Sequence, residues 1–134
     1  MKKELAHKAL EMRNMSYIPY SNFAVGAALL TADGKVYTGC NIENASFSPT
    51  ICAERTAFFK AVSEGVKDFA AIAIAGGPAG EMPRDYCPPC GVCRQVMAEF
   101  CKSDFKIYLV KSEDEIKEYT LEEILPLRFT SEDM

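Results

Sequence analysis

Apolar side chains recur at helical spacing over the first 15 residues of the chain. Four of them lie three or four positions apart and would share one face of a helix: Leu5, Ala9, Met12 and Met15. Pro19 cannot continue a helix, because its nitrogen carries no proton and its ring clashes with the preceding turn. We therefore expect an amphipathic helix over residues 2–15, followed by a turn.

Two apolar segments flank a short turn signal. Residues 23–30 are apolar almost throughout, and residues 36–42 contain several residue types that favour strands. The pair Asp33-Gly34 between them is typical of the tight turn of a β-hairpin. The pattern therefore predicts two antiparallel strands joined by this turn.

Helical and strand patterns alternate in the rest of the chain. Helices are expected over residues 52–64, 90–101 and 121–125, and strands over residues 69–75 and 107–110. This alternation predicts an α/β fold in which helices cover both faces of one sheet. Because no repeat or linker interrupts the 134 residues, we expect a single domain over residues 1–134.

Composition and charge narrow the classes of partner. The chain is 49% hydrophobic and 25% charged, as in an ordinary globular protein, and its net charge of −4 argues against binding nucleic acid. No apolar run approaches the roughly 18 residues of a membrane span, and the N-terminus does not resemble a signal peptide. We expect a cytoplasmic protein with a small-molecule substrate and no membrane partner. Its six cysteines are then better suited to metal binding or catalysis than to disulfides.

Two short motifs contain most of the chemistry that the sequence predicts. The letters CAE occupy residues 52–54, and PCGVC occupies residues 89–93. Thiolates are strong zinc ligands, whereas a glutamate beside them can act on water without binding the metal. Three ligands leave the fourth coordination position open, which is typical of a catalytic zinc site. The predicted ligands are Cys52, Cys90 and Cys93, and the predicted catalytic residue is Glu54.

Cys87 offers a competing C-x-x-C pair with Cys90. The two prolines after Cys87 force an extended backbone, whereas Cys90 and Cys93 would share the first turn of the expected helix. We therefore interpret Cys87 as a bystander. The alternatives are a closed four-cysteine site that includes Cys87 or Cys40, buried free cysteines, and a thiol redox pair.

Charges near the motifs would support three thiolates. Cys52 is also expected at the start of a helix, where free N–H groups and the helix dipole favour the thiolate. Arg55 follows the first motif, and its guanidinium would offset the negative charge of three thiolates on Zn²⁺. We interpret Arg55 as a residue that supports the ligands. The alternative for both Glu54 and Arg55 is an exposed position on a helix surface.

These motifs resemble those of the small, three-cysteine class of free-nucleoside cytidine deaminases, and the resemblance covers nearly the whole chain. The matching segments are residues 20–23, 25–29, 39–45, 52–57, 89–96 and 125–126. The resemblance implies a three-layer α/β/α sandwich around a five-stranded mixed sheet. It also implies one zinc ion per chain and a homotetramer whose active sites are shared between subunits.

The same resemblance implies the residues that would bind a nucleoside. Asn41 and Glu43 would bind the ribose 3′-hydroxyl, and alternate residues of a strand would indeed point to one face. Phe23 would pack on the pyrimidine, and the backbone of Ala53 would read the base carbonyl. Phe129 would come from a neighbouring subunit. The alternative is that the two phenylalanines belong to the core and that the polar pair forms a turn.

Two residues depart from the resemblance. Phe47 stands where the family often has tyrosine, and Cys87 adds a thiol near the expected metal. The expected reaction is hydrolytic deamination of cytidine and deoxycytidine, a step of pyrimidine salvage, with Glu54 transferring every proton. Other interpretations are a deaminase of an aminoacyl-nucleoside antibiotic, a nucleic-acid-editing deaminase, and a structural zinc module for protein interactions.

Overall fold

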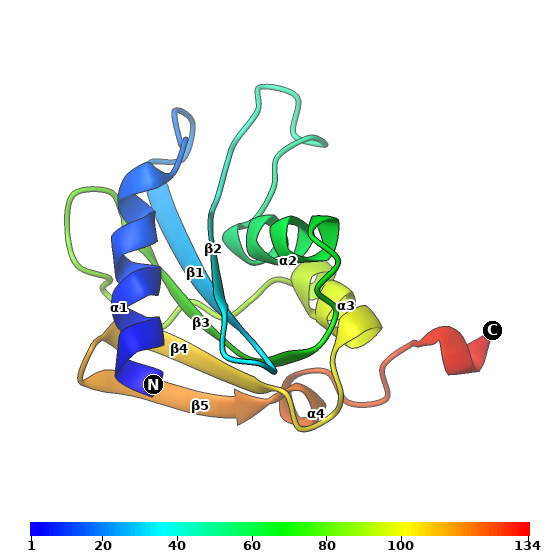
Figure 1. Cartoon of the computed structure of the whole chain (residues 1–134). Coiled ribbons are helices and arrows are strands. Elements are labelled where there is room, and N and C mark those ends of the chain that lie inside the picture. The colour runs from blue at the N-terminus through cyan, green and yellow to red at the C-terminus, as the bar shows by residue number, and fades with distance from the viewer.

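The computed structural model describes all residues, 1–134, and is built around a five-stranded mixed sheet (Figure 1). The strands are β1 (Phe23–Thr31), β2 (Val36–Cys40), β3 (Phe69–Pro78), β4 (Lys106–Ser112) and β5 (Glu115–Thr120). Their order across the sheet is β2-β1-β3-β4-β5. Only β3 and β4 run parallel, and the other neighbouring pairs are antiparallel.

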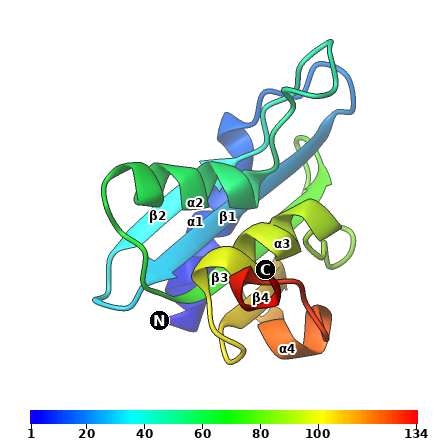
Figure 2. The same cartoon turned by 90° about the vertical axis from the view of Figure 1, so that its right-hand side faces the viewer.

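Helices cover both faces of this sheet, which confirms the expected α/β/α sandwich. In Figures 1 and 2, α1 lies on one face, while α2 and α3 lie side by side on the other. The helices are α1 (Lys2–Met12), α2 (Ala53–Ser63), α3 (Gly91–Phe100) and α4 (Leu121–Ile124), with short 3-10 turns η1 (Arg13–Met15) and η2 (Ser131–Asp133). None of these helices has the length and apolar character needed to cross a membrane.

The two faces are packed with side chains of different size. On the α1 face, mostly alanines meet, including Ala6 and Ala9 of α1 and Ala73 of β3. A Cβ on Gly26 would lie 2.0 Å from the carbonyl oxygen of Ala9, so this close approach of α1 to β1 requires glycine. Larger side chains fill the opposite face under α2 and α3, among them Phe58, Ile72, Ile74, Met97 and Ile107.

Element boundaries differ from the pattern-based predictions, most clearly in the first helix, β2 and β3. The first helix becomes a 3-10 turn after Met12, and β2 ends at Cys40, although an isolated bridge from Ile42 to Ile51 keeps the next residues extended. β3 continues through two glycines to Pro78. β5 was not predicted from the residues at all.

Candidate zinc site and active site

The three predicted ligands lie together where α2 and α3 begin. Cys52 is the N-cap of α2, Cys90 is the N-cap of α3, and Cys93 lies in the first turn of α3. The Sγ atoms of Cys52 and Cys90 are 3.7 Å apart, and those of Cys90 and Cys93 are 3.5 Å apart. Tetrahedral zinc with Zn–S bonds of about 2.3 Å requires sulfurs about 3.8 Å apart. The three thiols therefore fit a zinc ion with small adjustments.

The surroundings of Cys52 favour its thiolate. A hydrogen bond from Cys93 and the Arg55 guanidinium lower the pKa of Cys52 to about 5, against the opposing effect of burial. The Nη2 atom of Arg55 lies 3.5 Å from the Cys52 sulfur. The hydrogen bond between Cys93 and Cys52 raises the pKa of Cys93, and burial adds to this effect. Arg55 thus lies beside the ligands, where the sequence predicted it.

Glu54 is buried in the first turn of α2. In the sequence it lies after Cys52 and before Cys90 and Cys93. Its side chain is 4% exposed, and it is one of three buried polar or charged residues in the chain. Burial raises the pKa of this carboxyl to about 7, while a hydrogen bond from Cys93 acts in the opposite direction. A carboxyl with such a pKa can both accept and release a proton near neutral pH. The alternative of an exposed helix glutamate is therefore wrong.

Neither of the other two candidate thiols joins the cluster. The group of mutually close thiols contains only Cys52, Cys90 and Cys93, with all sulfurs within 4.8 Å of one another. Cys87 lies instead against Gly76, where an added Cβ would be 2.8 Å from its sulfur, and burial raises the pKa of the Cys87 thiol to about 11. The Cys40 thiol is buried at the end of β2 and donates to the Met15 carbonyl at 3.5 Å. The geometry therefore provides three thiol ligands and leaves the fourth coordination position open.

Asn41 and Glu43 lie just beyond the end of β2, so the strand alternation used to pair them does not apply as expected. The Asn41 side chain contacts the edge of β1: its Nδ2 donates to the Phe23 carbonyl at 2.9 Å, and its Oδ1 accepts from the Val25 amide at 3.0 Å. Asn41 is therefore already anchored to the segment that carries Phe23. One Nδ2 proton remains for another acceptor.

The Glu43 carboxylate is anchored to the turn before β1. Its Oε1 accepts from the backbone amides of Tyr20 and Ser21 at 3.1 and 3.2 Å, and the Ser21 hydroxyl donates to Oε2. The Ser21 hydrogen bond lowers the pKa of Glu43 below its usual range. Glu43 also lines a cavity of about 290 Å³ with Phe47 and Thr50. The sequence motif contained Tyr20 and Ser21, but we assigned them no role.

The remaining candidate residues occupy different surroundings. Phe23 begins β1, is 40% exposed and lines a cavity of about 380 Å³ with Gly76 and Cys87. Ala53 is the first residue of α2, where a backbone N–H has no partner within the helix. Phe129 is 59% exposed near the C-terminus, and its carbonyl accepts from Gln95 of α3 at 2.7 Å. Phe47 is 85% exposed.

Arg94 is a further residue near the site, and the sequence places it after Arg55 as the less favoured of two arginines that follow a ligand motif. Its Nε donates to the Pro89 carbonyl at 2.8 Å, and its Nη1 donates to the Ile124 carbonyl at 2.7 Å. These bonds connect the residue before Cys90 to the end of α4. The available signal was its position directly after Cys93, which matches that of Arg55 after the first motif.

Comparison with known proteins gives consistent matches. The model of the family described as the cytidine and deoxycytidylate deaminase zinc-binding region matches residues 1–109. A cytidine deaminase of Halalkalibacterium halodurans is 52% identical over 130 residues, covering 97% of this chain and 95% of that protein. One of Sporosarcina psychrophila is 48% identical over 132 residues, covering 98% of this chain and 93% of that protein.

Solved structures agree with these matches. The 1.6 Å crystal structure of cytidine deaminase from Burkholderia pseudomallei has a TM-score of 0.85 and 43% identity, and the match covers 94% of this chain and 97% of that one. A blasticidin-S deaminase of Bacillus cereus is less similar, at 33% identity over 130 residues, covering 95% of this chain and 91% of that protein. The resemblance found in the motifs is confirmed. The chain belongs to the cytidine and deoxycytidylate deaminase zinc-binding family.

Proposed function

We propose that this protein is a zinc-dependent hydrolase that converts cytidine and deoxycytidine, with water, to uridine or deoxyuridine and ammonia. The observation that carries the proposal is the cluster of three thiols with buried Glu54 between them in sequence. The cytidine deaminases similar to the chain support the substrate class. Each reaction consumes one water and releases one ammonia, so that the exocyclic amino group at C4 is replaced by oxygen.

Cys52, Cys90 and Cys93 would hold the zinc ion. When bound, zinc supplies a Lewis acid that makes water acidic enough to give a nucleophile near neutral pH. Glu54 would accept the proton from this water, transfer a proton to N3 of the pyrimidine, and assist protonation of the departing amino group. Arg55 would keep the Cys52 sulfur anionic through its contact at 3.5 Å.

The nucleoside would lie across the segments that carry Phe23, Asn41 and Glu43. The hydrogen bond from Asn41 to the Phe23 carbonyl supports this assignment, since it joins a sugar-binding candidate to a base-binding candidate. The Glu43 carboxylate would accept from a ribose hydroxyl, and its negative charge would repel a 3′-phosphate. The free N–H of Ala53 at the start of α2 is suited to a carbonyl oxygen of the base.

We further propose that residues 1–134 form one domain that assembles as a homotetramer, with Phe129 contributed to a neighbouring active site. Large apolar side chains on the surface support an assembly: Phe47 is 85% exposed and Leu127 is 102% exposed. In Figure 1 the C-terminal segment, drawn in red, extends away from the sheet of its own chain. The proposal includes a cytoplasmic role in pyrimidine salvage, for which the similar cytidine deaminases are the support.

An ultraviolet assay with three substrates tests the proposal. Cytidine and deoxycytidine should be deaminated, with release of one ammonia per nucleoside, and a chelator should abolish the activity until zinc is returned. Blasticidin S, an aminoacyl-nucleoside, serves as the competing substrate. Turnover of blasticidin S without turnover of cytidine would establish the alternative deaminase, and no turnover of any of the three would contradict the proposal.

A further inference from the structure

Arg13 is a buried arginine whose hydrogen bonds all go to backbone carbonyls. It follows α1 in the η1 turn and is 9% exposed. Its Nε donates to Ala24 at 3.0 Å, its Nη1 to Glu81 at 2.9 Å and its Nη2 to Pro78 at 2.9 Å. A guanidinium is rarely buried without a carboxylate or a ligand to neutralise it. Three backbone acceptors from three segments indicate that Arg13 fixes the path of the chain.

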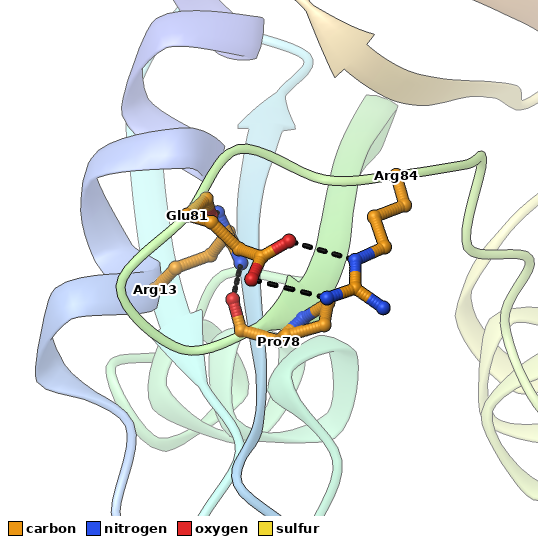
Figure 3. A network of polar contacts seen from close by, with 4 residues as sticks. All are labelled: Arg13, Pro78, Glu81 and Arg84. Carbon is orange, nitrogen blue, oxygen red and sulfur yellow. Dashed lines mark hydrogen bonds and ion pairs between the residues drawn. The ribbon is translucent and has the colours of Figure 1, made fainter.

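The carboxylate of Glu81 is not the partner of Arg13. Figure 3 shows that it pairs instead with Arg84, through contacts of 2.7 Å from Nε to Oε1 and 3.2 Å from Nη2 to Oε2. That ion pair is exposed, and so it contributes little to folding. A substitution of the Glu81 side chain would therefore remove the contact with Arg84 and keep the contact of the Glu81 carbonyl with Arg13.

The three carbonyls surround the end of the sheet at which Phe23 lies. Phe23 pairs with Pro78 across β1 and β3, and Ala24 is the next residue of β1. The guanidinium also lies against Gly77, since an added Cβ there would be 3.4 Å from Nη2. A single side chain thus connects the end of α1 to the strand that carries Phe23 and to the strand beside it.

The third contact reaches the segment that leads to the zinc ligands. Glu81 lies in the loop between β3 and α3, and this loop also carries Cys87 before it arrives at Cys90. Cys87 and Phe23 line the same cavity of about 380 Å³. Moving the loop or the start of β1 would therefore change the shape of this cavity, whereas Glu54 on α2 would remain in place.

We propose that Arg13 is a positioning residue for nucleoside binding, because its guanidinium fixes Phe23 and the loop after β3 relative to each other. This inference rests on the proposed function, in which Phe23 packs on the base. Arg13 does not touch the reacting atoms. Its removal should weaken binding of the substrate far more than it slows proton transfer by Glu54.

The variant Arg13→Lys tests this inference. Lysine keeps the positive charge but presents one nitrogen, which cannot reach three carbonyls as the planar guanidinium does. We expect a folded protein with one zinc per chain, a KM for cytidine raised about tenfold, and a kcat within about threefold of the parent protein, because a pocket wall away from the reacting atoms contributes equally to binding of the substrate and of the transition state. The control Glu81→Gln removes the exposed ion pair but keeps the carbonyl, and it should leave both constants unchanged.

A double-mutant cycle with Phe23→Leu separates positioning from a general loss of stability. If Arg13 acts through Phe23, KM in the double variant should rise by less than the product of the two single fold-changes. Independent effects would give that product. Three outcomes would overturn the inference. They are an unchanged KM in Arg13→Lys, a KM in the double variant that rises by the full product of the two single fold-changes, and a fall in kcat that accompanies a loss of thermal stability.

Amide hydrogen exchange provides a readout that does not depend on activity. In Arg13→Lys, exchange should become faster in residues 78–84 and in residues 22–25, while α3 remains unchanged. If the parent protein deaminates no nucleoside, the proposed function fails, and this exchange pattern alone decides whether Arg13 fixes the two segments. An exchange rate that increases equally in all segments, including α3, would contradict the role.

Discussion

At the scale of single residues, the site combines side chains held with different strength. Glu54 is buried and fixed within a helix, whereas Glu43 is only half-buried and held by a turn. Burial raises the pKa of Glu54, and hydrogen bonds lower that of Glu43. Two carboxylates of the same type therefore suit opposite tasks: Glu54 can move protons, and Glu43 stays ionised to accept a hydroxyl.

Replacing Glu54 with alanine should separate metal binding from catalysis. The variant keeps all three thiols, so we expect it to retain one zinc per chain in metal analysis. Its turnover of cytidine should fall by at least about 10³-fold, since the proposed function assigns every proton transfer to this one carboxyl. Near-normal activity in the zinc-loaded variant would contradict the role assigned to Glu54.

Serine substitutions should distinguish the ligands from the extra thiol. Cys90→Ser removes a sulfur 3.5 Å and 3.7 Å from its two neighbours, and the purified variant should contain little zinc. Cys87→Ser is the matched control from the same loop, and it should retain the metal. The zinc-to-protein ratio measured for both decides the point. A metal-free Cys87→Ser variant beside a zinc-loaded Cys93→Ser variant would reverse the choice of pair.

At the scale of elements, the start of a helix positions each motif. Cys52 and Cys90 are N-caps without a side-chain cap bond to their helices, so both sulfurs remain available to a metal. The sequence predicted these starts because apolar periodicity and Pro89 mark them clearly. The anchoring of Asn41 and Glu43 could not be predicted in this way, since it depends on a turn formed by residues distant in sequence.

β5 shows a second limit of pattern analysis. The segment Glu115–Thr120 is largely charged, and Ile116 and Tyr119 are only partly buried. It forms the outer edge of the sheet, next to β4, where one side needs no partner and polar side chains are tolerated. Only the family resemblance led to five strands. Gly76 and Gly77 similarly ended the predicted β3 too early, although there they admit the neighbouring residues Cys87 and Pro83.

The packing of α1 on β1 can be tested at Gly26. In Gly26→Ala the new Cβ would lie 2.0 Å from the Ala9 carbonyl oxygen, so the helix backbone must move. We expect a loss of about 3 kcal/mol in the free energy of unfolding, measured by urea denaturation. Gly91→Ala is the control, because nothing lies within 4 Å of an added Cβ there. Equal stability of the two variants would show that α1 is not held closely against β1.

At the scale of the whole molecule, one chain does not enclose its candidate substrate residues, since Phe23 is 40% exposed and Phe129 is 59% exposed. Phe23 and Glu43 line separate cavities, and Phe129 lies in the segment beyond α4. Exposed Phe47 adds an apolar side chain to the same cavity as Glu43. These features suit a site that neighbouring subunits complete, and they give the proposed tetramer a functional reason beyond stability.

Subunit sharing leads to a complementation experiment with two inactive variants. Glu54→Ala lacks the proton-transfer group, and Phe129→Ala lacks the aromatic side chain proposed to cover a neighbour's base. In a mixed tetramer, an intact Glu54 can meet an intact Phe129 from another subunit, so co-expression should recover a measurable fraction of the parent activity. Each variant alone should be a tetramer of the 14.8 kDa chain by light scattering, with low activity.

The same mixture also distinguishes a site contained within one chain. If Phe129 served its own subunit, each active site in the mixture would lack either Glu54 or Phe129. The mixture would then show no more activity than the sum of the two separate variants. Mixing the purified variants without dissociation is the control, because subunits that do not exchange cannot complement one another. Recovery that requires shared assembly would therefore assign Phe129 to the neighbouring active site.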